Sequence, residues 1–368
     1  MIQHTRRPKG RHGRTGDEER DGTAARRGQC ADGRAIGVRD VARRAGVSTA
    51  TVSRVLNGTP TVAAAYQERV LQAMAELQYH PNRLARNLRR QQAEMIGVLV
   101  ADVENPHFAQ MVRVVEDAAF AQGYRVLLCN TDETAAKQRA YLEMLLAEHV
   151  AAVVLSPSDP QGDEIAAVLN RGIPLIAFDR PVADPRADAV LVDNGGAGRL
   201  ATEHLRAAGH TRIGFISDPE VATGVERLGG YKAVMRAAGL QPCAQGGHSR
   251  IDGGMAATAA LLRAHPDLTA LILGNNLMAL GALKALRAQG VRIPQDVALV
   301  ALDDPFWAEV VDPPLTTLAQ PVRAMARSVA DLLLDRLRTG RTQPQRVVFD
   351  FELCPRASVG PPLTVSAL

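Results

Sequence analysis

A short segment near the start of the chain concentrates side chains that suit contacts with phosphates and base edges. Residues 47–60 read VSTATVSRVLNGTP, so hydroxyls, an amide and a guanidinium stand close together. Hydroxyl and β-branched residues are poor helix formers, because they lose side-chain freedom or compete for backbone hydrogen bonds. The same side chains bind phosphate oxygens and base edges well. We therefore interpret one face of this segment as a surface that lies against nucleic acid.

A second set of polar side chains follows the apolar runs of the later part of the chain. Ligands of open α/β folds bind beyond the carboxyl ends of the strands, so residues directly after predicted strands are candidates for a pocket. For any single Asp, the alternative is that it only caps the helix that follows. The candidates are Asn105 to Phe108, Ser156, Asp179, Arg180, Asp218, Asn275, Asn276 and Asp303.

Three helices are expected to position the first set. From Val38, apolar residues recur at helical spacing until Gly46, and a second helix follows with Ser48 as its N-cap. Asn57-Gly58 ends that helix, and residues 62–79 predict a third amphipathic helix. The pattern is a helix-turn-helix, whose second helix enters the major groove of DNA.

The exposed positions of the second helix predict how bases are read. Arg54 can make the bidentate contact to guanine that is the commonest specific pairing. Thr49 and Ala50 can pack against a thymine methyl group. The sequence therefore predicts base contacts from this helix.

Alternating apolar runs and helical segments from Met95 onward predict parallel sheets with helices on both faces. The runs are IGVLVAD, YRVLLCN, AAVVLS, IPLIAFD and AVLVD, then RIGFISD, ALILGN and VALVALD. The two series indicate two doubly wound parallel-sheet subdomains, so the fold class is an α/β core preceded by an all-α domain. Helices are expected at 107–122, 133–148, 162–171, 196–208, 225–238, 253–264 and 276–289.

Charge is distributed unevenly along the 368 residues. Residues 1–90 hold 18 Lys+Arg and 8 Asp+Glu, whereas the remainder holds 25 and 31. A basic front joined to an acidic remainder is typical of a polyanion-binding module attached to another domain. A solvated basic tail accounts for part of the excess, since 9 of those 18 cations precede Ile36, but residues 36–90 alone hold 9 cations and 3 acids.

Several classes of protein are disfavoured by composition. The longest apolar runs are strand-sized and fall short of the roughly 20 residues that a membrane helix needs, so no membrane partner is expected. Residues 1–35 contain no apolar signal core, and we interpret them as a disordered basic tail whose translation in the cell stays open. The cysteines (Cys30, Cys129, Cys243 and Cys354) suggest neither disulfides nor a metal site, so we expect a cytoplasmic, nucleoid-associated protein without cofactors.

The motifs of both parts resemble those of the lactose/galactose repressor (LacI/GalR) family of bacterial transcription regulators. The resemblance runs from Ile36 to about Arg356. It rests on DVARRAGVSTATVSRVLNG, YHPNRLARNLR, GHTRIGFI, GNNLMALGALKAL, and DDPFW followed by PPLTTLAQP. It implies a periplasmic-binding-protein-like type I core behind the helix-turn-helix, joined by a hinge helix that folds on the operator.

The resemblance also implies a set of DNA contacts. Leu88, from paired hinge helices, would enter the minor groove as an apolar wedge that unstacks a base step and kinks the duplex. Gly37 stands where the family usually has a capping Thr, so one phosphate contact is missing there. The candidate DNA-binding residues are Ser48, Thr49, Ala50, Thr51, Ser53, Arg54, Asn57, Tyr79, Asn82, Ala85, Leu88 and Arg89.

An effector pocket is implied in the larger part. Carboxylates, amides and a guanidinium around an aromatic ring suit a polyhydroxylated ligand. Ser249 stands where members commonly place a stacking aromatic, and Val221 where the purine-responsive member has an arginine, which disfavours a purine. We therefore expect a sugar or a sugar acid, with Phe306 and Trp307 as a substitute stacking face. The alternative for Trp307 is a core or hinge residue. The candidate effector-binding residues are Phe108, Asp179, Thr223, Arg227, Asn275, Asp303, Trp307 and Gln320.

The expected organisation is a dimeric transcriptional repressor under the control of a small molecule. A homodimer would bind a pseudo-palindromic double-stranded DNA operator, and effector binding and DNA binding would influence each other reciprocally. The expected segments are a tail (1–35), the helix-turn-helix (36–80), the hinge (81–93), an N-subdomain (about 94–193 and 321–340), a C-subdomain (about 194–320 and 341–357) and a second tail (358–368).

Two other classes of function remain as alternatives. GAGRLA at 196–201 matches G-x-G-x-x-A and would indicate a nucleotide-sensing (NAD-type) regulator or an oxidoreductase, but three residues separate it from its strand. A transport binding protein would share the larger part, but it has no use for a basic front. The serine-hydrolase elbow, the phosphate-binding loop and the H-E-x-x-H zinc motif are all missing from the sequence, so we do not expect an enzyme.

Overall fold

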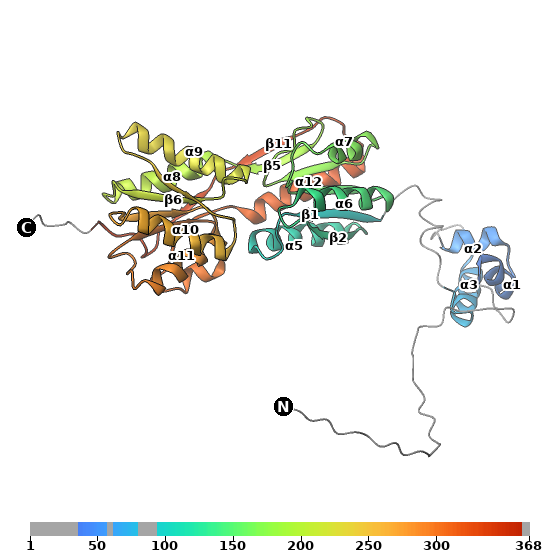
Figure 1. Cartoon of the computed structure of the whole chain (residues 1–368). Helices are drawn as coiled ribbons and strands as arrows, with labels where there is room; N and C mark the ends of the chain where they lie inside the picture. Colours follow the sequence, from blue (N-terminus) through green and yellow to red (C-terminus); the bar gives the residue numbers. More distant parts are fainter. Residues whose placement is uncertain (1–35, 57–61, 80–93, 363–368) are drawn as a thin grey trace, which may run out of the picture. The chain divides into compact units, whose positions relative to one another are not determined.

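The computed structural model of the chain describes residues 36–56, 62–79 and 94–362 (Figure 1). It separates into two compact units, one up to Gln91 and one from Gln92 onward, and each is described by itself. The predictions for the first tail, for the hinge and for Asn57, Asn82, Ala85, Leu88 and Arg89 lie outside the described residues. The second tail is described up to residue 362, and its predicted start at residue 358 is wrong, because Ser358 is fully buried and its hydroxyl accepts from the Thr316 N–H at 2.7 Å.

The first unit contains a small helical core. Its described helices are α1 (Val38–Ala45), α2 (Thr49–Leu56) and α3 (Ala64–Glu76). Gly46 ends α1 with a left-handed φ of 63°, which a glycine adopts without strain. Val41, Val52 and Val70, one from each helix, are fully buried against one another, so the apolar spacing of the sequence does form a common core.

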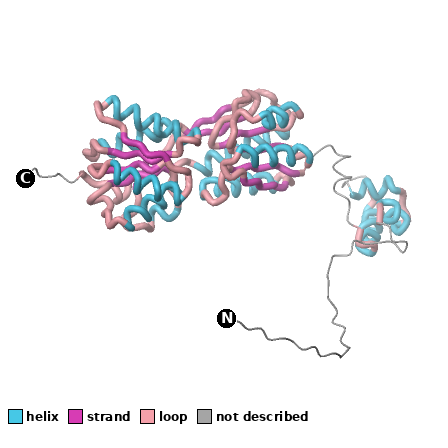
Figure 2. Tube along the Cα trace, in the orientation of Figure 1, coloured by secondary structure: helices cyan, strands magenta, loops and turns pink. Residues whose placement is uncertain are grey.

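The second unit contains two six-stranded sheets of matching design. The first is wholly parallel, with the order β11-β5-β4-β3-β1-β2. Its strands are β1 (Met95–Val100), β2 (Arg125–Asn130), β3 (Ala152–Leu155), β4 (Leu175–Phe178), β5 (Asp188–Val192) and β11 (Arg346–Phe349). Two helices cover each face: α5 (Pro106–Ala121) and α12 (Val322–Thr339) on one, α6 (Ala135–Ala147) and α7 (Asp163–Asn170) on the other (Figure 2).

The second sheet has the order β12-β10-β9-β8-β6-β7, and only the pair β10–β12 is antiparallel. Its strands are β6 (Ile213–Ser217), β7 (Cys243–Gly246), β8 (Ala270–Leu273), β9 (Ala298–Leu302), β10 (Thr316–Ala319) and β12 (Glu352–Cys354). Its helices are α8 (Asn194–Ala207), α9 (Ala222–Ala237), α10 (Ile251–Ala264) and α11 (Asn276–Ala288), with a short 3-10 helix, η1 (Phe306–Glu309). The predicted fold class of two parallel-sheet α/β subdomains behind a helical domain is confirmed. No helix in the described ranges is both long and apolar enough to span a membrane.

The last connection between the sheets differs from the expected domain boundary. The sequence places the return to the second subdomain near residue 342, but β11 pairs with β5 from Arg346 to Phe349. The chain therefore crosses only between Phe349 and β12, and the assignment of residues 341–349 to the C-subdomain is wrong. The cause is a contact between distant parts of the chain: the Gln345 N–H and Arg341 both bind the buried carboxylate of Asp188, and these bonds hold the segment against the first sheet.

The second glycine of GAGRLA, Gly198, has a packing role in this fold. The motif lies in α8, which packs closely against α9. A Cβ atom on Gly198 would lie 1.9 Å from the Arg227 carbonyl oxygen, and one on Gly230 would lie 2.0 Å from the Gly195 carbonyl oxygen. Gly198 and Gly230 therefore allow the two helix backbones to approach, and this packing accounts for Gly198 without a bound dinucleotide.

We expect Gly198→Ala to destabilise the second unit by about 1–3 kcal/mol, the usual range for overpacking. Gly229, also in α9, is the matched control, because a Cβ there meets nothing within 4 Å. Gly229→Ala should stabilise by about 0.5–1 kcal/mol, since alanine is the better helix former. Urea unfolding of both variants measures the difference, and equal midpoints would contradict the packing role.

Candidate functional site

The outer face of α2 carries the side chains that the sequence assigns to base reading. The Ser48 hydroxyl accepts a hydrogen bond from the Thr51 N–H at 3.0 Å and so caps the helix. Val52 faces the core, whereas Thr49, Ala50 and Arg54 are exposed and Thr51 and Ser53 are half-buried. The helix thus presents a polar face that is open to a partner.

Arg54 differs from its basic neighbours in having no ionic partner among the described residues. Arg43 pairs with Asp40, Arg44 pairs with Glu76, and Arg69 donates to the Gly46 carbonyl. The Arg43 pair lies within α1, whereas Arg44 and Arg69 link α3 to α1 and to the turn after it. Arg54 is therefore the cation of α2 that stays available for a phosphate or a guanine edge.

Tyr79 is the one predicted contact of the segment after α3 that lies within the described residues. It is half-buried, packs against the core of the first unit, and its N–H donates to the Met74 carbonyl at 2.9 Å. The predicted contact between Tyr79 and a phosphate stays a prediction.

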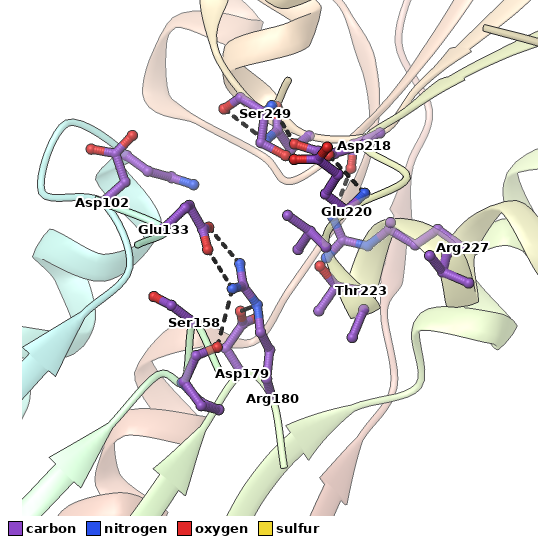
Figure 3. Close-up of a pocket in the computed structure, with 18 of the residues that line it drawn as sticks. Asp102, Glu133, Ser158, Asp179, Arg180, Asp218, Glu220, Thr223, Arg227 and Ser249 are labelled. Carbon is purple, nitrogen blue, oxygen red and sulfur yellow. Dashed lines mark hydrogen bonds and ion pairs between the residues drawn. The ribbon is translucent and has the colours of Figure 1, made fainter. Parts of the chain in front are cut away.

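A cavity of about 880 Å³ lies in the second unit, where the carboxyl ends of both sheets face each other (Figure 3). Figure 3 shows Asp102, Glu133, Ser158, Asp179 and Arg180 on one side, all from loops that follow strands of the first sheet. The other side carries Asp218, Glu220, Thr223, Arg227 and Ser249 from loops and helix starts of the second sheet. The volume of the cavity is within the range of about 300–1,000 Å³ that is usual for small-molecule sites.

Seven of the eight predicted effector residues line this cavity: Phe108, Asp179, Thr223, Arg227, Asn275, Asp303 and Gln320. The prediction for Trp307 is wrong. Its ring is half-buried and packs against the core between β8, β9 and α11, because η1 turns it inward. Phe306 is 81% exposed and does not line the cavity either, so neither residue supplies a stacking face there.

Asp179 and Asp303 occupy equivalent positions in the two halves. They follow β4 and β9, which are third in the order of their sheets, and both have a left-handed φ, 70° and 71°. Each N–H donates to the neighbouring strand, Asp179 to Val190 and Asp303 to Leu318. Aspartate is one of the few non-glycine residues that tolerate this conformation, which directs two buried carboxylates at the cavity.

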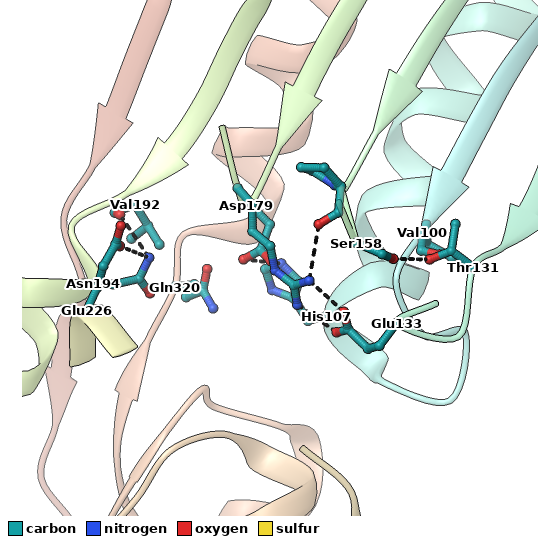
Figure 4. A network of polar contacts seen from close by, with 12 residues as sticks. Val100, His107, Thr131, Glu133, Ser158, Asp179, Val192, Asn194, Glu226 and Gln320 are labelled. Carbon is teal, nitrogen blue, oxygen red and sulfur yellow. Dashed lines mark hydrogen bonds and ion pairs between the residues drawn. The ribbon is translucent and has the colours of Figure 1, made fainter. Parts of the chain in front are cut away.

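A network of charged side chains lines the side of the cavity that is formed by the first sheet (Figure 4). Arg180 donates two hydrogen bonds of 2.6 Å to the carboxylate of Glu133. Its Nε lies 3.4 Å from Asp179, and the His107 Nε2 lies 3.9 Å from the same carboxylate. Burial alone would lower the pKa of Arg180, but the hydrogen bonds of Glu133 and the charge of Asp179 raise it, so the guanidinium stays charged.

Arg227 is the central buried cation of the second half. Its Nε donates to the Asn194 side chain at 2.8 Å, and its Nη1 donates to the Gly274 carbonyl at 2.6 Å. Asn275 caps α11, since its side chain accepts from the Met278 N–H at 2.7 Å. The capping alternative thus holds for Asn275, although its side chain also borders the cavity.

Direct contacts join the two halves beside the cavity. Arg250, at the start of α10, forms an ion pair with Asp132, which follows β2. On α11, the Asn276 amide donates to the Asn105 side chain at 2.9 Å. Sequence reasoning missed Asp132, Glu133 and Arg250, although the same rule of residues after strands, applied after YRVLLCN, would have found the two acids.

Comparisons with known proteins agree with this architecture. The family model for bacterial regulatory proteins of the lacI family matches residues 38–82. The model for periplasmic binding proteins and the sugar binding domain of the LacI family matches residues 93–356. Neither match points to dinucleotide chemistry, so the alternative based on GAGRLA is not supported.

Individual relatives match over most of their length. The ribose operon repressor of Halalkalibacterium halodurans is 38% identical over 301 residues, 82% of this chain and 90% of that protein. The transcriptional regulator CelR of Thermobifida fusca is 37% identical over 330 residues, 86% of this chain and 96% of that protein. A lac repressor dimer bound to operator and the anti-inducer ONPF superposes with a TM-score of 0.77 at 28% identity, over 88% of this chain and 99% of that one.

The helix-turn-helix with an exposed polar face, the paired α/β subdomains around a polar cavity, and these matches lead to one assignment. The predicted family resemblance is confirmed. The chain belongs to the LacI family of bacterial regulatory proteins and is a DNA-binding transcription regulator.

Proposed function

We propose that this regulator is a repressor that binds a pseudo-palindromic operator as a homodimer and responds to a sugar in the cavity of its second unit. The single observation that carries the proposal is the polar wall of that cavity. Its carboxylates, amides and guanidiniums can accept and donate to the hydroxyls of one ring. Related proteins support this class of ligand, since one is named a ribose operon repressor and another was solved as a CelR–cellobiose complex.

We also propose that the protein does not catalyse a reaction. We expect it to act in the cytoplasm, at the nucleoid. The ligand would act by binding alone, so it should be recovered unchanged after incubation with the protein. Chromatography of the incubated sugar tests this, because any product that forms in proportion to protein concentration would show turnover.

Selection of bound duplexes from a random pool, followed by titration with sugars, tests the whole proposal. We expect a two-fold symmetric site whose affinity falls steeply with salt, because phosphate contacts release counterions. D-ribose and cellobiose are the first probes for release of the protein from that site. An asymmetric site would contradict the dimeric repressor, and a site that no sugar affects would contradict control by a sugar.

Arg54→Ala should relax base preference at one position of each half-site by about 1–3 kcal/mol. The reason is that Arg54 is exposed on the base-reading helix and has no ionic partner among the described residues. Arg39→Ala, an exposed cation on α1, is the control, and it should weaken binding to all sequences alike. Repeating the selection with both variants measures this, and an unchanged consensus for Arg54→Ala would remove Arg54 from the base-reading set.

A further inference from the structure

Carboxylates outnumber guanidiniums in the wall of the cavity. Of the residues that the structure describes, nine Asp or Glu line it, against three Arg and no Lys. Four of these carboxylates, Asp102, Asp179, Asp218 and Asp303, are only 6–7% exposed. Charges held at such depth are weakly screened by solvent, so they set the potential that a ligand meets.

Two of the three guanidiniums are already neutralised by the protein. Arg180 donates two hydrogen bonds to Glu133 and lies beside Asp179. Arg250 is paired with Asp132, which also lies 3.3 Å from the Lys137 ammonium. Neither cation has a charge left over to balance an anionic ligand.

Arg227 is the remaining cation, and two of its nitrogens are occupied. Nε and Nη1 donate to Asn194 and to the Gly274 carbonyl. The loop before α9 contributes two acids to the same side of the cavity, Asp218 and Glu220 (Figure 3). One guanidinium among these carboxylates leaves an excess of negative charge on this side as well.

The hydrogen-bonding capacity of the wall also disfavours an anionic ligand. Ionised carboxylates only accept hydrogen bonds, so a ligand beside them must donate. Hydroxyl and ammonium groups can do so, whereas a ligand carboxylate or phosphate offers further acceptors and repels the wall. With an effective dielectric constant of about 20, two like charges roughly 7 Å apart weaken binding by about 50-fold.

We propose that the cavity selects uncharged or positively charged sugars and rejects sugar acids and sugar phosphates. This inference rests on the proposed function, since it takes the cavity to be the effector site. It decides between the two ligand classes that the sequence leaves open, a sugar and a sugar acid. The discriminating element is the set of four buried carboxylates, with Arg180 and Arg250 neutralised by their own partners.

Matched ligands of different charge test the inference by titration calorimetry on the full chain. The probes are D-ribose with D-ribonate and ribose 5-phosphate, cellobiose with cellobionate, and D-glucose with glucosamine and glucuronate. Within the set that binds, we expect the anion to bind at least about 10-fold more weakly than the neutral sugar. An anion that binds as tightly as its neutral counterpart, or more tightly, overturns the inference. If no member of any set binds, it is the proposed function that fails.

Asp102→Asn shows whether charge is the cause. The Asp102 carboxylate accepts from the Glu104 N–H at 2.9 Å, a bond that an asparagine oxygen can keep, so the loop should retain its shape. We expect the variant to reduce the ratio of the anion's dissociation constant to that of the neutral sugar by about 3- to 10-fold, while Asp117→Asn, exposed on α5, should not change this ratio. If the ratio of the two dissociation constants is the same in Asp102→Asn and the native protein, the inference is wrong.

Discussion

Asp188→Ala is expected to destabilise the second unit by about 3–5 kcal/mol, the usual range when one partner of a buried ion pair is removed. Asp188 is the first residue of β5 and has no exposed surface. Its carboxylate accepts from the Arg336 Nε at 2.8 Å, from the Arg341 Nη2 at 2.9 Å and from the Gln345 N–H at 2.6 Å. One side chain of β5 therefore binds both α12 and the segment that leads from α12 into β11.

The loss of stability is large because Arg336 and Arg341 would remain without the Asp188 carboxylate. Arg336 is 8% exposed on α12, and the Asp188 carboxylate is its only ionic partner among the described residues. Arg341 would retain Asp335 but would lose its second carboxylate. Removing Asp188 thus leaves an uncompensated guanidinium in the interior and frees the segment that carries β11.

The contribution of Asp188 should depend on pH. Burial alone would raise its pKa, but the hydrogen bonds from Arg336 and Arg341 outweigh burial and hold the pKa below its usual value. A carboxylate with a depressed folded-state pKa stabilises the fold above its unfolded pKa of about 3.9, and this stabilisation is lost as pH falls through the folded pKa. The difference in unfolding free energy between native protein and variant should therefore be constant near neutral pH and shrink below about pH 4.

Urea unfolding at a series of pH values measures both effects. Asp117→Asn is the control, because the Asp117–Arg113 ion pair is exposed and lies within one turn of α5. That variant should unfold close to the native midpoint. If Asp188→Ala also unfolded there, the buried cluster would not be what holds α12 and β11 to the first sheet.

The fold was predictable wherever local pattern and final packing agree. The apolar runs of β1 and β8 are buried at nearly every position, so composition alone identifies them as central strands. Strand β7 reads CAQG, alternates between half-buried and exposed, and carries no such signal. Strand β11 has a similarly mixed pattern, and its position depends on Asp188, more than 150 residues earlier in the chain. Contacts that distant cannot be read from periodicity.

The cavity was predictable because it follows from topology. Parallel strands end at one edge, so residues as distant as Asp179 and Asp303 had to come together once two such sheets faced each other. The prediction for Trp307 failed because the position of a residue after a strand does not say where its side chain points. Only the turn of η1 decides that its ring enters the core, and no feature of DDPFW shows that turn.

Asp303→Asn is expected to weaken sugar binding by about 10- to 100-fold, the range for a lost hydrogen bond to a charged group. Asn is the appropriate replacement because it tolerates the left-handed φ of 71°, whereas alanine would add backbone strain. The Asp303 Oδ1 accepts from the Gln320 Nε2 at 2.6 Å, and its Oδ2 accepts from the Asn276 side chain at 3.2 Å. An asparagine must turn its own amide toward one of these donors.

Gln320 can rotate to accept a hydrogen bond from the asparagine amide. The substitution should therefore weaken sugar binding more than it lowers the stability of the fold. Its Oε1 is buried and has no hydrogen-bond partner in the described part of the chain, so a rotation of its amide would satisfy an asparagine donor at position 303. The ligand would still lose a charged acceptor, and the sugar concentration that releases the operator should rise by the same factor as the dissociation constant. Calorimetry and operator release measure the two factors, with Asp312→Asn, an exposed position outside the cavity, as the control. If the variant bound sugar normally but no longer released the operator, Asp303 would not bind the ligand. It would instead couple sugar binding to operator release.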